Sequence, residues 1–327
     1  MKKLALLPLA LIAAAPPAPA PVLSPNEIVA AAKAEEWTAI APTDLLVMDL
    51  AADRDAKPRR VVIQLMPAPF SQGWIGNIRT LAAARWWDGT SVNRVQDNYV
   101  VQWGDVSEKK ALPTGLAAMQ QDDYRTAISN PEVWHSSSLQ TVVEHVAAEA
   151  KAGVEVKGPP TTVRTDIYGN TAFHKGWPVG FSYVGQNPET LAWPVHCYGM
   201  VGVGRNMPPD TGTGAELYTV IGHAPRHLDR NIALVGRVIS GIEHLSSLPR
   251  GTGDLGFYKT AAERVPILSV RVGDQVTGLP RYDYLSTESA SFAAYADARA
   301  NRRDAFFITP AGGADICNIP VPVRVGR

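Results

Sequence analysis

The sequence predicts a mainly β protein. Short runs of β-branched and aliphatic residues recur along the chain, and the 26 prolines and 27 glycines spread between them are typical of many turns. With 46% hydrophobic and 19% charged residues, the chain has enough apolar surface to form a core. Its formal net charge of +0 excludes the class of proteins that hold nucleic acid through phosphate contacts.

The amino end has the pattern of a secretory signal peptide. Lys2 and Lys3 precede an apolar run over residues 4–15, which gives way to small residues and prolines. We predict a signal peptide over residues 1–20 and an exported, periplasmic protein. The alternative is a permanent membrane anchor, but the run has roughly a dozen residues where crossing a bilayer needs about 20. We therefore expect no stable membrane insertion after processing.

The two cysteines, Cys197 and Cys317, are too few for a small disulfide scaffold or a tetrahedral cysteine zinc site. Export would bring them to an oxidising compartment, in which a disulfide persists. A bridge between them would close a loop of about 120 residues and stabilise the fold by several kcal/mol. From the sequence alone, a bridge and two buried free thiols both remain open.

The segments that follow the signal predict, in order, a helix, a hairpin, a second helix and a strand pair. Ser24 is a suitable N-cap for a helix from Pro25 to Trp37, within an amino-terminal helical extension over residues 24–42. Aliphatic runs around a charged turn indicate the hairpin, and apolar residues at helical spacing indicate the second helix. The predicted segments are Leu45 to Leu50 and Arg60 to Met66 for the hairpin, Phe70 to Trp87 for the helix, and Val92 to Asp105 for the strand pair.

Residues 106–193 are richer in charge and in turn formers, and we interpret them as an insertion in a β framework. Ser137 and Gln140 form a capping box that predicts one helix there. Residues 275–327 form a C-terminal extension, with a helix from Thr287 to Arg302. Between the two, the predicted elements are strands at Cys197 to Val203, Glu216 to Ile221, Ile232 to Ile239 and Val265 to Val272, with a short helix at Gly241 to Leu248.

Several strings carry a resemblance in their order along the chain. They are Val61-Val-Ile-Gln-Leu-Met66, Trp87-Asp-Gly-Thr90, Val92-Asn-Arg-Val95, Tyr99-Val-Val-Gln-Trp-Gly-Asp105, Gly199-Met-Val-Gly-Val-Gly204, Glu216-Leu-Tyr-Thr219, His227-Leu-Asp229 and Val235-Gly-Arg-Val238. Together they resemble the cyclophilin-type peptidyl-prolyl isomerases over most of residues 43–274, apart from the insertion. The resemblance implies a closed eight-stranded antiparallel barrel capped by helices, with a substrate groove on its outer face.

The chemistry of such an enzyme needs a fixed hydrogen-bond donor rather than a nucleophile. Rotation of the bond before proline crosses a barrier of about 18 to 20 kcal/mol. As the bond twists, the proline nitrogen gains a lone pair, so a donor aimed at it stabilises the twisted state more than the planar states. The resemblance implies that Arg94 is this catalytic donor. Read without the resemblance, Arg94 could be a surface arginine in an ordinary ion pair.

The resemblance also implies the residues that bind the substrate. The proline pocket would be lined by Tyr99, Val100, Tyr218 and Leu228. The substrate backbone would form hydrogen bonds with the side chain of Gln102 and with the main chain near Gly204 and Arg205. His227 would form part of the groove wall. Because alternate strand residues face inward, we expect one or more of the pocket residues to belong to the barrel core instead. Gln102 could equally satisfy a loop backbone.

Five groove positions depart from the usual residues of the family. Histidine is replaced by Asn93, asparagine by Arg205, glutamine by Glu216, an aromatic residue by His227 and a second histidine by Ile232. The changes at Asn93 and His227 alter the wall of the groove and leave Arg94 in place.

The sequence therefore predicts an exported prolyl isomerase that assists the folding of proline-containing polypeptides without a cofactor. We expect nearly flat activity around neutral pH, because arginine does not titrate there. We expect no metal, because Pro225 separates His223 from His227. The alternative is a non-catalytic periplasmic chaperone or assembly factor that binds peptides in the same groove. The third option is an extracytoplasmic hydrolase, but the sequence has no motif of a catalytic nucleophile to support it.

Overall fold

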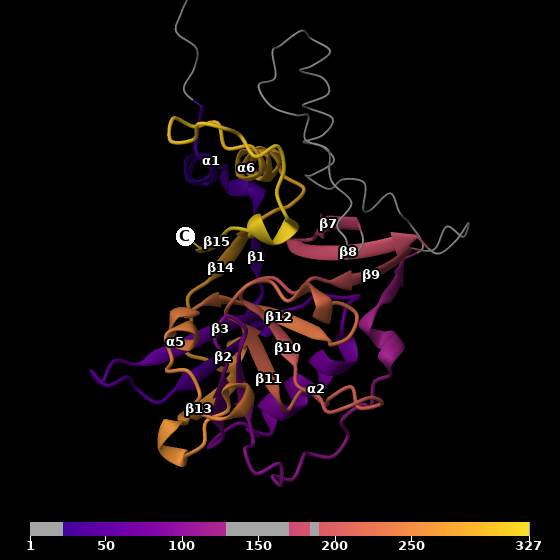
Figure 1. Cartoon of the computed structure of the whole chain (residues 1–327), viewed down its shortest axis with the longest axis vertical. Coiled ribbons are helices and arrows are strands. Elements are labelled where there is room, and N and C mark those ends of the chain that lie inside the picture. Colours follow the sequence, from indigo (N-terminus) through magenta and orange to yellow (C-terminus); the bar gives the residue numbers. More distant parts are fainter. Residues whose placement is uncertain (1–21, 129–169, 184–189, 327) are drawn as a thin grey trace, which may run out of the picture.

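The core of the protein is a closed antiparallel β-barrel of eight strands (Figure 1). The computed structural model describes residues 22–128, 170–183 and 190–326. Around the barrel, the strands follow in the order β10 (Met200–Val203), β11 (Leu217–Val220), β5 (Val100–Gly104), β4 (Ser91–Val95), β13 (Val265–Val272), β2 (Leu45–Leu50), β3 (Arg59–Leu65) and β12 (Leu234–Ser240). The predicted fold class, mainly β with a closed eight-stranded barrel, is confirmed.

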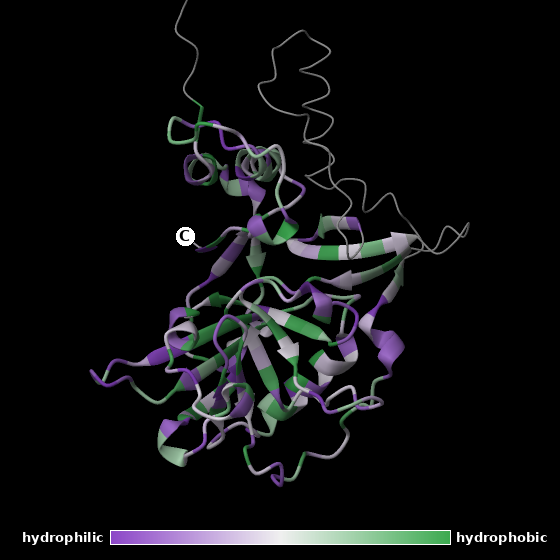
Figure 2. Cartoon of the chain, viewed as in Figure 1, coloured by the Kyte–Doolittle hydropathy of each residue, from purple (hydrophilic) through white to green (hydrophobic). Residues whose placement is uncertain are grey.

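Period-two alternation explains how these short strands enclose a core. In the hairpin of β2 and β3, Met48 pairs with Val61 and Leu46 with Ile63, and all four side chains lie in the main hydrophobic cluster. The charged residues at the tip of the hairpin remain outside, and Figure 2 shows this turn as hydrophilic beside hydrophobic strands. The hairpin that the sequence predicts is therefore present, with the predicted bounds for β2.

Two helices cover the barrel, and both are shorter than predicted. Helix α2 (Gln72–Ala83) buries Trp74, Ile78 and Leu81 in the barrel core. Helix α5 (Glu243–Ser246) is a single turn, because Gly241 has a positive φ of 82° and Pro249 follows shortly after. In the described ranges, no helix is both long and apolar enough to cross a membrane. Residues 1–20, the predicted signal peptide, lie outside those ranges.

The amino-terminal and carboxyl-terminal extensions pack against each other beside the barrel. Strand β14 (Tyr282–Leu285) pairs with both β1 (Trp37–Ile40) and β15 (Val323–Val325), and α1 (Pro25–Ala31) packs on α6 (Ala290–Ala300) (Figure 1). Ser24 caps α1 in a reciprocal capping box with Glu27, which confirms the predicted start of this helix. The helix ends at Ala31, before the predicted end at Trp37, and Trp37 belongs to strand β1.

The described part of the predicted insertion forms a third sheet. Its strands follow in the order β6 (Thr126–Ile128), β9 (Thr190–Pro194), β8 (Trp177–Tyr183) and β7 (Asn170–His174). Trp177 and Val179 alternate along β8 with their side chains in the main core cluster. The helix predicted after Ser137 lies outside the described residues.

The guanidinium of Arg237 on β12 joins the barrel to this third sheet. It is buried, donates from Nε and Nη2 to Gln64 Oε1 at 2.9 and 2.8 Å, and donates from Nη1 to the carbonyl of Gly176 at 2.8 Å. The guanidinium carbon also lies 4.5 Å from the centre of the Trp177 ring. Burial lowers the pKa of Arg237 to about 10, so the side chain is still charged at neutral pH.

A disulfide between Cys197 and Cys317 attaches the carboxyl-terminal extension to the barrel. The two Cα atoms are 5.0 Å apart, and 120 positions separate the residues in the chain. Of the two possibilities that the sequence leaves open, the structure has the bridge. It joins the segment just before β10 to the short turn that precedes β15.

Replacing both cysteines with serine should lower the free energy of unfolding by about 2 to 4 kcal/mol, because the bridge restricts a long loop in the unfolded chain. Urea denaturation of the wild type and of the C197S/C317S variant measures this difference. As a control, a reducing agent should lower the midpoint of the wild type and leave that of the variant unchanged. Two free thiols in the unreduced wild type would contradict the assignment.

Candidate active site

Four barrel strands place one row of residues side by side on the outer face of the barrel. Arg94 on β4 pairs with Gln102 on β5, Gln102 pairs with Tyr218 on β11, and Tyr218 pairs with Gly202 on β10. The neighbours of these residues along the strands point the opposite way: Val101, Trp103 and Leu217 lie in the barrel core. Residues far apart in the sequence therefore form one continuous surface.

A β-bulge adjusts the position of Arg94 in this row. The register between β4 and β5 shifts between Val92 and Arg94, which leaves Asn93 as the extra residue. Val92 and Val95 on either side remain in the core. The bulge therefore places both Asn93 and Arg94 along the wall of the same pocket.

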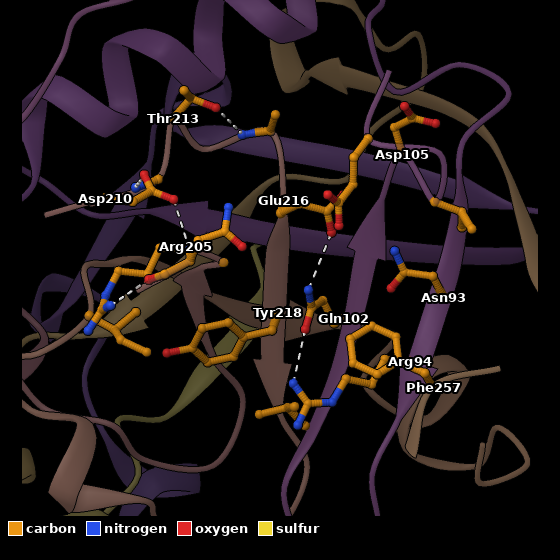
Figure 3. A pocket seen from close by; sticks show the side chains of 18 of the residues that line it. Asn93, Arg94, Gln102, Asp105, Arg205, Asp210, Thr213, Glu216, Tyr218 and Phe257 are labelled. Carbon is orange, nitrogen blue, oxygen red and sulfur yellow. Dashed lines mark hydrogen bonds between the residues drawn. The ribbon is translucent and has the colours of Figure 1, made fainter. Parts of the chain in front are cut away.

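The row lies in a pocket of roughly 650 Å³, which Figure 3 shows from close by. All but one of the site residues predicted from the sequence line this pocket. Those that line it are Arg94, Tyr99, Val100, Gln102, Gly204, Arg205, Tyr218 and Leu228.

His227 is the exception, and its predicted place in the groove wall is wrong. Its side chain is exposed, and its ring stacks on the ring of Tyr99 with 6.5 Å between centres and 12° between planes. Because Tyr99 lines the pocket and His227 does not, the histidine supports the wall from outside.

The expectation that some pocket residues belong to the barrel core is also wrong. Val100, Tyr218 and Val220 form a separate small cluster, with Tyr99 and Ile232 packed against it. The alternation along β5 and β11 sends Val101 and Leu217 inward and this set outward. The pocket thus has an apolar floor of its own.

Neutral oxygen atoms hold the guanidinium of Arg94 at the pocket. Nε donates to the carbonyl of Leu255 at 2.8 Å, Nη1 donates to Gln102 Oε1 at 3.2 Å, and Nη2 donates to Gln96 Oε1. Within the described ranges Arg94 has no ion pair with a carboxylate, so the alternative of an ordinary ion pair is wrong. Partial burial lowers the pKa of Arg94, but an arginine keeps its proton at neutral pH.

The loop at residues 250–258 adds three pocket residues that the sequence analysis missed, Leu255, Phe257 and Tyr258. Leu255 provides the acceptor for Arg94 Nε, and the ring centre of Phe257 lies 5.2 Å from the guanidinium carbon of Arg94. Tyr99 lies 5.7 Å away by the same measure. The strings that carry the family resemblance do not include this loop, so nothing in the sequence marked it.

Gln102 connects Arg94 to a carboxyl group. Its Oε1 accepts from Arg94, and its Nε2 donates to Glu216 Oε2 at 3.4 Å (Figure 3). Both amide atoms are therefore engaged with side chains, and neither is used to satisfy a loop backbone. Arg94 fixes the direction of the amide, because a guanidinium can only donate and therefore faces Oε1.

Glu216 is a partly buried acid that lacks a cation beside it in the described part of the chain. It lies between Gly104 and Gly204, and a Cβ atom on Gly104 would come within 1.8 Å of Glu216 Oε1. Burial raises the pKa of Glu216 from 4.5 to about 7, although hydrogen bonds from Gln102 and Asn93 act in the opposite direction. The sequence marked Glu216 only as a departure from the family; its burial is a property of the fold.

The described residues contain no group of three or more His, Cys, Asp or Glu side chains that could hold a metal ion.

Comparison with known proteins identifies one matching family model. The model described as "Cyclophilin type peptidyl-prolyl cis-trans isomerase/CLD" matches residues 57–272. No curated protein matches the chain.

Solved structures that match the chain include two cyclophilins. Cyclophilin AquaCyp293 from Hirschia baltica has 18% sequence identity and a TM-score of 0.62, and the match covers 89% of this chain and 94% of that one. A cyclophilin type peptidyl-prolyl cis-trans isomerase from Cryptosporidium parvum, crystallised in the presence of the dipeptide Ala-Pro, has 9% identity and a TM-score of 0.37, with coverage of 69% and 98%. The first of these agrees with the barrel described above.

Glu216→Gln should remove a pH dependence of stability. Since the pKa of Glu216 is about 7 in the folded protein and near 4.5 when exposed, the folded state binds more protons between these values. The free energy of unfolding should therefore fall as pH rises from about 4.5 to about 7, and this fall should be smaller in the variant. At pH 8 the variant should be more stable by about 1 to 3 kcal/mol, because it buries no charge. Urea denaturation at pH 5 and pH 8 measures both effects.

Glu35→Gln, which neutralises an exposed acid, serves as the control and should follow the wild type at both pH values. A parallel pH dependence in the wild type and in Glu216→Gln would contradict the assignment.

Proposed function

Because the chain belongs to the cyclophilin-type peptidyl-prolyl cis-trans isomerase family, we propose that it isomerises X-Pro bonds in exported polypeptides as they fold. The observation that carries the proposal is Arg94, a charged donor held by neutral acceptors beside the apolar floor of the pocket. A second possibility, a non-catalytic chaperone, is favoured by the altered lining residues Asn93, Glu216 and Ile232.

Arg94 has donors to spare for a substrate. A guanidinium carries five N–H groups, and described protein acceptors take three of them. The remaining N–H groups on Nη1 and Nη2 can address the proline nitrogen, whose lone pair becomes available only when the amide is twisted. No carboxylate among the described residues pairs with Arg94, so its charge is available to the twisted amide.

The apolar floor formed by Val100 and Tyr218 suits the ring of the proline. That ring can stay in place while the preceding carbonyl turns, so Arg94 would meet the nitrogen at a constant position. A charge-assisted hydrogen bond supplies roughly 1.5 to 3 kcal/mol, and a catalyst that reaches milliseconds must lower the barrier by about 5.5 to 7 kcal/mol. The remainder would come from holding the ring and the flanking carbonyls.

We place this activity in the periplasm as part of the proposal. Lys2, Lys3 and the apolar run over residues 4–15 support export. The bridge between Cys197 and Cys317 is compatible with an oxidising compartment.

Arg94→Ala should lower kcat/KM by about 10- to 100-fold, which corresponds to the loss of one charge-assisted bond. A protease-coupled assay with a proline tetrapeptide measures the rate, and a titration with the same peptide measures binding. Arg60→Ala, which removes an exposed arginine paired with Asp49, is the control and should match the wild type. Equal activity in the wild type and in Arg94→Ala would contradict the catalytic role. Binding without isomerisation by the wild type would favour the chaperone.

The activity should fall as pH drops below about 7, in place of the flat profile expected from Arg94 alone. Protonation of Glu216 weakens the hydrogen bond that it accepts from Gln102 Nε2, because a neutral carboxyl is a weaker acceptor than a carboxylate. The amide that holds Arg94 through Oε1 is then less firmly fixed. In Glu216→Gln the profile should be flat across pH 6 to 8. Measuring kcat/KM for both proteins over this range tests the coupling, and an inflection of the same size in the variant would exclude Glu216 as its source.

A further inference from the structure

A tyrosine forms the floor of the apolar pocket, and its hydroxyl needs a partner. Tyr218 is only 4% exposed, and its ring lies over Gly202, where a Cβ atom would come within 2.3 Å of the tyrosine hydroxyl. A buried hydroxyl without a hydrogen bond destabilises the folded state. Figure 3 shows the hydroxyl pointing away from Gln102.

His196 receives this hydroxyl behind the pocket. Its Nε2 lies 2.8 Å from the oxygen of Tyr218, and the two rings are nearly parallel, with 12° between their planes. His196 is completely buried, and burial lowers its pKa although Asp229 acts in the opposite direction. Burial thus favours the neutral form of the imidazole.

Asp229 determines which nitrogen of His196 carries the proton. Its Oδ1 accepts from His196 Nδ1 at 2.9 Å and from the backbone N–H of His196 at 2.9 Å. Because a carboxylate only accepts, Nδ1 bears the hydrogen and Nε2 is left as an acceptor. Tyr218 must then donate its proton to Nε2, away from the substrate.

The carboxyl-terminal extension holds this pair in place. Arg226 Nε donates to Asp229 Oδ2 at 2.6 Å, and Arg226 Nη1 lies 3.7 Å from Asp315 Oδ2. Cys197, the neighbour of His196, is bridged to Cys317. An ion pair and a covalent bond thus connect the floor of the pocket to the tail.

We propose that His196 and Asp229 are positioning residues for proline binding: they take up the Tyr218 hydroxyl so that only the face and edge of its ring meet the proline. The inference rests on the proposed function, because it concerns the same pocket. Since the ring contact is the same in the planar and twisted states of the substrate, its loss should weaken binding rather than the chemical step.

The test compares His196→Leu with the double variant His196→Leu/Tyr218→Phe. The single variant leaves the hydroxyl without its acceptor, so KM should rise about tenfold while kcat changes less than twofold. The double variant removes both partners of the bond and should return KM to within threefold of the wild type. His174→Leu removes another buried histidine outside the pocket lining and should leave KM unchanged. An unchanged KM in His196→Leu, or no recovery in the double variant, would overturn the proposal.

A second measurement does not depend on turnover or on the folding of a variant. The ¹⁵N shifts of the His196 ring in the wild type report its tautomer, and we expect a proton on Nδ1 and none on Nε2. A proton on Nε2 would overturn the proposal. If the wild type binds a proline tetrapeptide without isomerising it, the proposed function fails, and the Kd of the same variants then decides the positioning role.

Discussion

The register of four neighbouring strands is the constraint on which the site depends. Because β4, β5, β11 and β10 pair antiparallel, Arg94, Gln102, Tyr218 and Gly202 lie in one row, although up to 124 positions separate them in the printed sequence. A slip of one residue in any pairing would exchange the outer and inner faces of a strand. The core residues Val101, Trp103 and Leu217 prevent such a slip, since each would leave the core. The packing of the barrel and the geometry of the pocket therefore have the same origin.

The polar groups around the pocket have different hydrogen-bond partners, and each partner affects what the pocket can bind. Neutral oxygens hold Arg94, so its charge stays available to a ligand. His196 holds the hydroxyl of Tyr218, so the floor of the pocket remains apolar. Burial raises the pKa of Glu216 to about 7, and its amide neighbours only partly offset this effect. The glycines at 104 and 202 make room for Glu216 and Tyr218.

The extensions are integrated with the barrel rather than appended to it. Strand β14 joins the two ends of the described chain in one sheet, and Arg237 connects the barrel to the turn at Gly176. The bridge from Cys197 to Cys317 ends beside His196, directly behind the pocket. The position of the tail and the shape of the pocket are therefore linked, because both are connected to the buried hydrogen bonds behind Tyr218.

The sequence by itself determined the elements with strong local signals: the hairpin of β2 and β3, strand β13, and the start of α1 at Ser24. It also identified Arg94, Gln102 and Tyr218 through short strings in a set order. Tertiary structure alone decided that His227 lies outside the pocket, that Phe257 lines it, and that His196 and Asp229 hold Tyr218. It also decided between a bridge and two thiols. Periodicity and caps act within a few residues, whereas burial and hydrogen-bond partners arise between segments that meet only when the barrel closes.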